Sequence, residues 1–360
     1  MREITYAEAI REATAKAMRE DKNVIVIGEG VPDPKAIFGT TKGLREEFGP
    51  DRVFDMPVSE NGVTGVCIGA ATQGLKPIMV HQRIDFTLYA FDQIVNNAAK
   101  WHSMFGGKAG NVPLVIRAII GRGWGQGNQH SQNLAHLYAM IPGLKVVVPS
   151  NARDAHDLLL WAINEPNPVM FIEHRWLHNT SSYLNPPSIA IDKEVKARYV
   201  TEGNHLTLVA WSYMVVEALK AQRFIKEYTD IQLEIIDMRS LRPLDIGAVK
   251  YSVKKTKRLL VLEEAWRFNG LASEIISEIA EDDDVPLFAA PRRITLPDCY
   301  APSTPALTKH YYPTTIDIVH TILDMMGKDK KQYQRLFEAL ALDELSKQHD
   351  VPDSSFKGPF

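Results

Sequence analysis

The chain has 360 residues, of which 45% are hydrophobic and 24% are charged, a composition typical of a soluble globular protein large enough for two cores. The formal net charge of −3 predicts no strong attraction to nucleic acid or to an anionic membrane. No apolar run approaches the roughly 20 residues that span a bilayer. Cys67 and Cys299 form no CxxC pair, and no targeting segment is evident at the start, so we expect reduced thiols and a cytoplasmic protein.

The first half of the chain alternates predicted strands with predicted helices. Thr5 to Glu8 fits the capping box of a helix that starts close to the N-terminus. Short apolar runs of the kind that form buried parallel strands occur at 24–27, 77–80, 112–120, 145–148 and 168–172. Helical patterns lie at 62–75, 90–105 and 151–164. This alternation predicts a doubly wound α/β sheet with helices on both faces.

A polar stretch at 179–204, rich in Asn, Ser and Pro, predicts a linker between two modules. The second α/β module, at 205–327, has predicted strands at 206–210, 233–238 and 258–262 and helices at 214–228, 246–253 and 271–279. It has no Gly-rich phosphate loop and no evident catalytic cluster, so we interpret it as a scaffold and subunit-contact domain. A tail at 328–360 carries an apolar stripe that is expected to cover a groove on its own subunit or on a partner: Tyr333, Leu336, Phe337, Leu340 and Leu345.

The most informative motif is the segment 57–62 (PVSENG), which places Glu60 where a strand-like run gives way to a helix of small residues. Small residues allow a backbone or a flat ring to approach closely. Burial beside apolar surface raises the pKa of a carboxyl group, so a glutamate there can share a proton with a ring nitrogen. The alternative is that Glu60 only caps the helix, which stabilises it by roughly 0.3–1 kcal/mol.

The segments that follow Glu60 point to a family. They are 81–86 (HQRIDF), 90–100 (AFDQIVNNAAK), 121–131 (GRGWGQGNQHS), 141–150 (IPGLKVVVPS) and 167–169 (NPV). In order and spacing, residues 1–325 resemble the beta subunit of the thiamine-diphosphate-dependent dehydrogenase component of 2-oxoacid dehydrogenase complexes. The resemblance implies two doubly wound α/β modules, a transketolase-like pyrimidine-binding domain at 1–178 and a transketolase C-terminal-like domain at 205–327.

The resemblance also implies roles for four residues. Glu60 matches the glutamate that hydrogen-bonds the aminopyrimidine ring of thiamine diphosphate and favours its imino tautomer. Phe86 matches the aromatic residue under that ring, and Gln82 a polar position near the cofactor. His130 matches a histidine that serves the reaction intermediate and acyl transfer to a lipoyl group. On sequence alone, Phe86 would more often be a core residue and His130 a solvated loop residue.

Other motifs carry less. Because strand side chains alternate between faces, His81 and Arg83 are expected to point away from Gln82 unless the strand has ended, and they stay candidates for a substrate carboxylate. The glycine run from Gly121 to Gly127 is not a dinucleotide fingerprint. The histidines at 174 and 178 lack the glutamate of a zinc protease, and the acids at 263 and 264 are interpreted as a solvated loop.

Metals and partners follow from the resemblance as well. It implies a potassium ion at Leu114, Ala162, Ile163, Glu165 and Asn167, although Glu165 stands where the family usually has aspartate. The chain contains no Gly-Asp-Gly, the start of the diphosphate and magnesium segment. Magnesium requires near-octahedral oxygen ligands and bridges phosphates. The Mg²⁺ ligands are therefore expected on a separate alpha chain, in an α2β2 assembly.

The function expected from these features is oxidative decarboxylation of a 2-oxoacid, with transfer of the acyl group to a lipoyl acceptor, in which case a lipoyl acyltransferase is a further partner. A non-oxidative enzyme of the same architecture, an acyloin synthase or decarboxylase, is the alternative, and the added tail modestly supports it. The presence of Glu60, Phe86 and His130 argues against a regulatory paralogue without catalysis.

Overall fold

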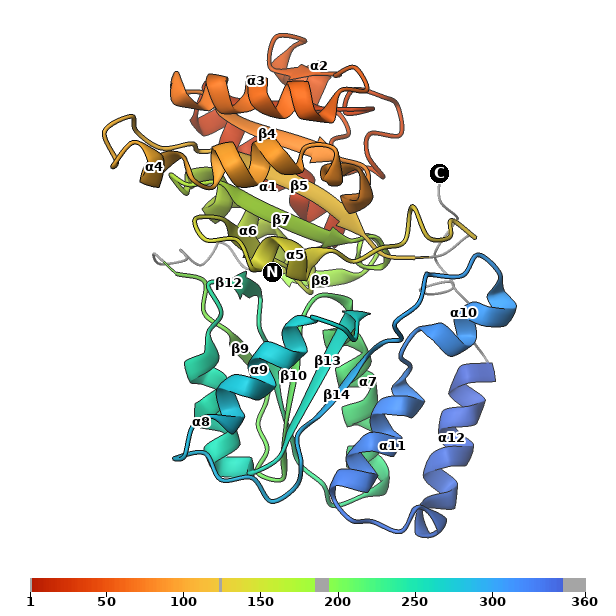
Figure 1. Cartoon of the computed structure of the whole chain (residues 1–360). Coiled ribbons are helices and arrows are strands. Elements are labelled where there is room, and N and C mark those ends of the chain that lie inside the picture. Colours follow the sequence, from red (N-terminus) through yellow and green to blue (C-terminus); the bar gives the residue numbers. More distant parts are fainter. Residues whose placement is uncertain (1, 123–124, 185–193, 346–360) are drawn as a thin grey trace.

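The computed structural model describes residues 2–122, 125–184 and 194–345, and these form two stacked α/β modules (Figure 1). No helix in these ranges is both long and apolar enough to cross a membrane. The first module contains a sheet of seven strands in the described part of the chain, in the order β12-β6-β7-β5-β4-β2-β3, with β12 (Ser240–Arg242) at one edge. Its parallel strands are β2 (Val24–Gly28), β3 (Val53–Phe54), β4 (Lys76–His81), β5 (Val115–Ile120), β6 (Lys145–Val147) and β7 (Val169–His174).

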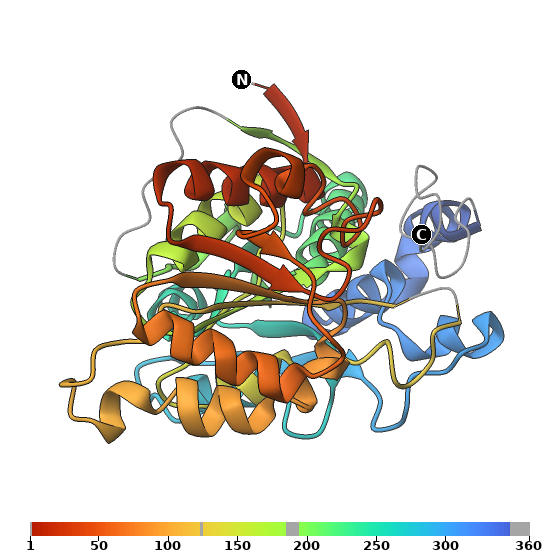
Figure 2. The same cartoon turned by 90° about the horizontal axis from the view of Figure 1, so that it is seen from above.

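Helices cover both faces of this sheet, as the alternation of elements predicts. Helices α1 (Tyr6–Glu20) and α6 (Ala152–Asn164) pack on one face through a common apolar cluster with β2. Helix α3 (Glu60–Thr72) packs on the other face against β2 and β4. Figure 2 shows α1 in red and α3 in orange on opposite sides of the strands. The capping box is confirmed, because the Thr5 and Glu8 side chains each accept from the other's backbone N–H.

Two local expectations for the first module are wrong in detail. Residues before α1 form β1 (Arg2–Thr5), which pairs antiparallel with β8 (Ser181–Leu184) inside the expected linker. The stretch expected as one helix at 90–105 contains a π-helical segment (Gln93–Ala98) followed by the short α4 (Trp101–Met104). Strands β1 and β8 form because they pair with each other across most of the first module, and the local sequence does not show this pairing.

The second module has a five-stranded sheet among the described residues, in the order β14-β13-β10-β11-β9. Its strands are β9 (Arg198–Thr201), β10 (Leu206–Ala210), β11 (Leu233–Asp237), β13 (Leu259–Trp266) and β14 (Arg292–Leu296), with only β9 antiparallel among them. Helices α8 (Ile246–Thr256) and α9 (Leu271–Ala280) pack on one face, while α7 (Tyr213–Tyr228) and α11 (Thr315–Met325) pack on the other. The short α10 (Pro305–Tyr311) lies before α11.

The tail covers its own subunit. A single 3₁₀ turn (Lys330–Tyr333) leads into α12 (Gln334–Leu345), which lies beside α7 and α11 (Figure 1). Leu336 and Leu340 are buried there, and Phe337 stacks on His320 of α11 with ring centroids 4.4 Å apart. Leu345, which was expected on the same stripe, is 82% exposed. Residues 346–360 of the predicted tail lie outside the described residues.

The two modules share structure across their boundary. Strand β12 (Ser240–Arg242) comes from the second module but pairs antiparallel with β6 of the first sheet. Asp154 at the start of α6 forms ion pairs with Arg198 at 2.8 Å and Arg239 at 3.1 Å. Arg198 also pairs with Asp237 at the end of β11. The two modules are therefore joined by backbone pairing of β12 with β6 and by ion pairs between partly buried side chains.

A buried ion pair lies in the centre of the first sheet. The Arg117 guanidinium on β5 donates to the Glu173 carboxylate on β7 at 2.6 Å, and both side chains are fully buried. His178 contacts the other carboxylate oxygen at 3.2 Å, and Arg117 also donates to the Thr40 hydroxyl. The neighbouring Arg117 holds the pKa of Glu173 below its ordinary value, although burial opposes this.

We expect Glu173→Gln to lower the free energy of unfolding by about 3–5 kcal/mol, because it leaves the Arg117 charge buried without its counter-ion. Chemical denaturation measures the loss. Glu194→Gln removes one partner of an exposed ion pair with Lys196 and serves as the control, with little expected change. Equal midpoints for the two variants would show that the buried pair adds nothing.

The acids at 263 and 264 are buried, so their interpretation as a solvated loop is wrong. The Glu263 carboxylate accepts backbone N–H groups of Leu271 and Ala272 at the start of α9. Burial nevertheless raises the pKa of Glu263 from 4.5 to about 7, because desolvation outweighs these hydrogen bonds.

Since the folded-state pKa of Glu263 lies above the unfolded value, its stabilisation is complete below about pH 4.5 and is lost as the pH rises to about 7. The free energy of unfolding should fall by about 1.4 kcal/mol per pH unit in that window from this group. Glu263→Gln cannot ionise and should remove that slope. Denaturation of both proteins between pH 5 and pH 8 measures it, and parallel stability curves would contradict the assignment.

Candidate active site

The candidate residues gather at one edge of the first sheet. Glu29 directly follows β2, Gln82 directly follows β4 and Gly121 directly follows β5, while Glu60 begins the helix after β3. Strands β2, β4 and β5 are parallel neighbours, so these segments meet outside their carboxyl ends. Ligands of open α/β sheets bind in this position.

Glu60 is the first residue of α3 and is only 7% exposed. Ser59 precedes it as N-cap without a capping side-chain bond, and the Glu60 carboxylate makes no hydrogen bond with any residue that the structure describes. The side chain therefore does not act as a helix cap here. Neither Glu60 carboxylate oxygen is among the buried atoms that lack a partner, so the group reaches the surface and is available to a ligand.

Glu29 is a site residue that the sequence analysis missed. Burial first, and then the nearby carboxylates of Glu60 and Asp55, raise the pKa of Glu29. Its Oε1 atom is buried without a hydrogen-bond partner among the described residues. The available signal was its position directly after the strand-like run 24–28, equivalent to that of Gln82 after β4. Two carboxyl groups thus share this part of the edge.

Gln82 lies directly after β4, at the same sheet edge as Glu29. Strand β4 ends at His81, so the alternation argument does not extend to Arg83. The Gln82 amide donates to the Glu29 carbonyl at 3.1 Å, which joins the ends of β2 and β4. His81 is fully buried, and burial lowers its pKa to about 4, so it is neutral at pH 7.

Phe86 and His130 are brought together. Phe86 is half-buried in the 3₁₀ turn Ile84–Leu88, and its ring meets the His130 ring edge to face with centroids 5.4 Å apart. This geometry is favourable for aromatic rings. Gln82 and Phe86 are only four residues apart on one segment. The pair of Phe86 and His130 therefore lies at the same edge of the first sheet as Glu29, Gln82 and Glu60.

The loop that carries His130 contacts the second module. Gly121, Gly125 and Gly127 have φ values of 113°, 69° and 68°, a region that side-chain-bearing residues rarely adopt, while Gly123 lies outside the described residues. A Cβ at Gly127 would collide with the Ser303 hydroxyl from the turn before α10. The second module is therefore more than a scaffold, because it supplies one wall beside the loop.

Comparison with known proteins decides the family. The family models "Transketolase, pyrimidine binding domain" and "Transketolase, C-terminal domain" match residues 2–180 and 195–318. Acetoin:2,6-dichlorophenolindophenol oxidoreductase subunit beta of Bacillus subtilis is 40% identical over 339 residues, which are 91% of this chain and 98% of the relative. Pyruvate dehydrogenase E1 component subunit beta of Rickettsia conorii is 41% identical over 280 residues, 78% of this chain and 85% of the relative.

The chain belongs to the transketolase-like family of dehydrogenase beta subunits. The fold agrees, since a split-gene transketolase described as an inactive beta4 tetramer superposes with a TM-score of 0.74 at 22% identity, covering 90% of this chain and 99% of that one. The resemblance stated from the sequence is confirmed, as are the two α/β domain types.

The residues at the sheet edge fit the pyrimidine half of thiamine diphosphate, the cofactor of this family. Glu60 offers a carboxylate that lacks a partner among the described residues, Gln82 offers an amide, and Phe86 offers a half-buried aromatic face. An aminopyrimidine presents ring nitrogens to polar groups and a flat face to an aromatic ring. The donor set therefore suits that end of the cofactor.

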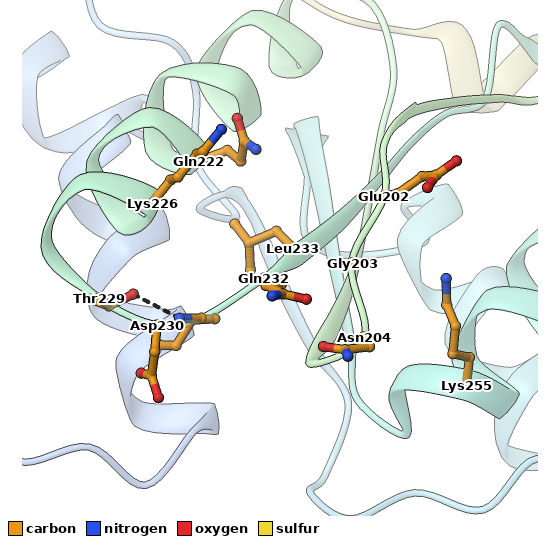
Figure 3. A pocket seen from close by; sticks show the side chains of 11 residues that line it. Glu202, Gly203, Asn204, Gln222, Lys226, Thr229, Asp230, Gln232, Leu233 and Lys255 are labelled. Atoms are coloured by element: carbon orange, nitrogen blue, oxygen red, sulfur yellow. Dashed lines mark hydrogen bonds between the residues drawn. The ribbon is translucent and has the colours of Figure 1, made fainter.

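A separate pocket of about 660 Å³ lies in the second module (Figure 3). It lies between the turn at Glu202 to Asn204 and the connection from α7 to β11, and Lys226 and Lys255 approach it from two helices. None of the residues at the sheet edge lines it. This family member's candidate site is thus an open edge rather than that pocket.

The carboxylate in the set of residues implied for potassium already has partners. The Glu165 carboxylate pairs with the Lys145 ammonium at 2.7 Å and accepts from Asn167. The carbonyl oxygens of Leu114 and Ala162 accept backbone N–H groups, and Ile163 is a buried core residue of α6. The Glu165 side chain therefore does not fit as a free ligand, and we derive no step through this ion.

Other metal sites receive no support. Within the described ranges, no group of three His, Cys, Asp or Glu side chains is arranged to hold a metal ion. The histidines at 174 and 178 contact different carboxylates, Glu264 and Glu173.

Because an ammonium group already compensates Glu165, we expect the same unfolding temperature in potassium and sodium chloride at equal ionic strength. Differential scanning fluorimetry measures both. Lys145→Met, which leaves Glu165 without that charge, is the companion variant and should unfold at a lower temperature. A stabilisation of the unchanged protein specific to potassium would support the five-residue set instead.

Proposed function

We propose that this chain is the beta subunit of a two-chain thiamine-diphosphate-dependent 2-oxoacid dehydrogenase, which decarboxylates a 2-oxoacid and passes the acyl group to a lipoyl acceptor. One observation supports this most directly. The Glu60 side chain is only 7% exposed, and its carboxylate has no hydrogen-bond partner in the described part of the chain. It lies at the carboxyl edge of the first sheet, in a chain that is 40% identical to an acetoin oxidoreductase beta subunit.

Each residue has a task that its geometry suits. Thiamine diphosphate, when bound, supplies the electron sink for decarboxylation. Glu60 places a carboxylate where it can hydrogen-bond a ring nitrogen, while burial and then the carboxylates of Glu60 and Asp55 raise the pKa of the nearby Glu29. Phe86 supports the ring face, and the His130 imidazole stands edge-on against Phe86, where its ring nitrogens can hydrogen-bond a bound molecule.

The site needs a second chain. The sequence contains no Gly-Asp-Gly for the diphosphate and magnesium, so the Mg²⁺ ligands belong to an alpha subunit in an α2β2 assembly. Apolar side chains are exposed around Glu60 and Phe86, namely Val58, Val66, Leu88 and Tyr89. Exposed apolar groups beside an incomplete site suit a partner surface.

The non-oxidative alternative gains nothing from the described tail, because α12 packs on its own module. Lipoyl-domain acylation by the assembled pair, with pyruvate and with branched-chain 2-oxoacids, tests the oxidative reaction. A carboligation product formed without any lipoyl acceptor would identify the alternative. The cytoplasmic location expected from two unpaired cysteines stays a prediction.

Glu60→Gln keeps the side-chain shape but removes its exchangeable proton, so turnover of the assembled enzyme should fall by at least about 10²-fold. Glu46→Gln on α2 (Leu44–Phe48) changes an exposed carboxylate and should keep full turnover. Steady-state kinetics with saturating cofactor compares them. Near-normal turnover of the Glu60 variant would remove the assignment.

A further inference from the structure

The turn that follows β4 holds the loop that bears His130, here called the His130 loop (residues 125–132). Arg83 precedes the 3₁₀ turn Ile84–Leu88, and Asp85 and Phe86 lie inside it. These three side chains contact the His130 loop or its approach at Gly121. Apart from Phe86, they have no role in the chemistry described above.

Arg83 spans the first part of the loop. Its guanidinium donates to the Gly121 carbonyl at 3.0 Å through one nitrogen and to the Gln126 side-chain oxygen through the other. The side chain is 3% exposed, and burial lowers its pKa to about 10, so it remains charged at neutral pH. A planar guanidinium can bridge two acceptors in fixed directions, which a lysine ammonium cannot reproduce.

Asp85 holds the far end of the same loop. Its Oδ1 atom accepts from the Gln132 amide at 2.7 Å, and the side chain is 7% exposed. His130 lies between the two attachment points, and its backbone N–H donates to the Gly127 carbonyl. The glycines at 121, 125 and 127 leave this loop with few conformational preferences of its own. Side-chain attachments must therefore select one conformation.

We propose that Arg83 and Asp85 are positioning residues, which fix the His130 loop so that the imidazole stands edge-on against Phe86 in the site. The effect that this positioning has on catalysis rests on the proposed function. The contacts of Arg83 and Asp85 are with Gly121, Gln126 and Gln132, so the proposed role of both residues acts through the position of His130. A displacement of about 1 Å of a catalytic group can cost on the order of 10²-fold in rate.

A double-mutant cycle on the assembled enzyme tests the coupling. Arg83→Lys should lower kcat by about 10-fold or more in the natural background. In the His130→Ala background the same change should cost no more than about 2-fold, because the group it positions is gone. The KM for the 2-oxoacid should change less than kcat. An equal loss in both backgrounds would overturn the proposal, since Arg83 would then act independently of His130.

Asp85 gives a second, conservative comparison. Asp85→Asn keeps an oxygen that accepts from Gln132 and should retain most of kcat, whereas Asp85→Ala should lower it as Arg83→Lys does. Loss of activity in both Asp85 variants alike would contradict a positioning role through this hydrogen bond.

Hydrogen exchange of peptides covering residues 125–132 tests the positioning role of Arg83 and Asp85 independently of the proposed enzymatic function. Exchange there should speed up in Arg83→Lys and Asp85→Ala. The control is Arg52→Gln, since Arg52 also donates to backbone carbonyls but far along the chain, at Met18, Asp21 and Val24. Unchanged loop exchange would overturn the positioning role. If the natural pair shows no turnover with any 2-oxoacid, the proposed function fails, while the exchange result still decides the loop.

Discussion

The parallel pairing of β2, β4 and β5 is the constraint on which the candidate site depends. Parallel strands end at the same edge, so three connections that are distant in sequence emerge side by side. The hydrogen bond from the Gln82 amide to the Glu29 carbonyl joins two of them directly. A shift of the register by one residue would turn every side chain at this edge to the other face of the sheet. The core of the sheet therefore positions the candidate site residues. Within that core, the ion pair of Arg117 and Glu173 joins strands β5 and β7.

Carboxylates at the carboxyl edge of the first sheet have fewer hydrogen-bond and ion-pair partners than the carboxylate in its core. Glu173 is fully buried but has Arg117 and His178 as partners, which keep it ionised. Glu60 and Glu29 are close to each other, and burial of Glu29 raises its pKa. Carboxylates that lack a protein partner are typical of sites that await a ligand or a partner chain.

Much of this could be predicted from the sequence, because local signals agreed with the fold. The run at 24–28 and the motif around Glu60 showed a strand and a helix start, and the order of several segments showed the family. Glu29 was missed because its position after a strand is a weak signal by itself; its importance comes from Glu60 across the sheet edge. Strand β12 and the contact of Ser303 with the His130 loop depend on partners far along the chain.

The second module takes part in the site because of how the modules are joined. Strand β12 extends the first sheet, and the Asp154 ion pairs fix the start of α6 to the second module. The guanidinium of Arg122, directly after Gly121, lies between the rings of Trp176 and Tyr312, at 4.2 Å and 3.7 Å from their centroids. Tyr312 belongs to the second module, so the approach to the His130 loop is packed from both modules. A rotation between the modules would break these contacts, so the loop that bears His130 depends on both modules keeping their relative position.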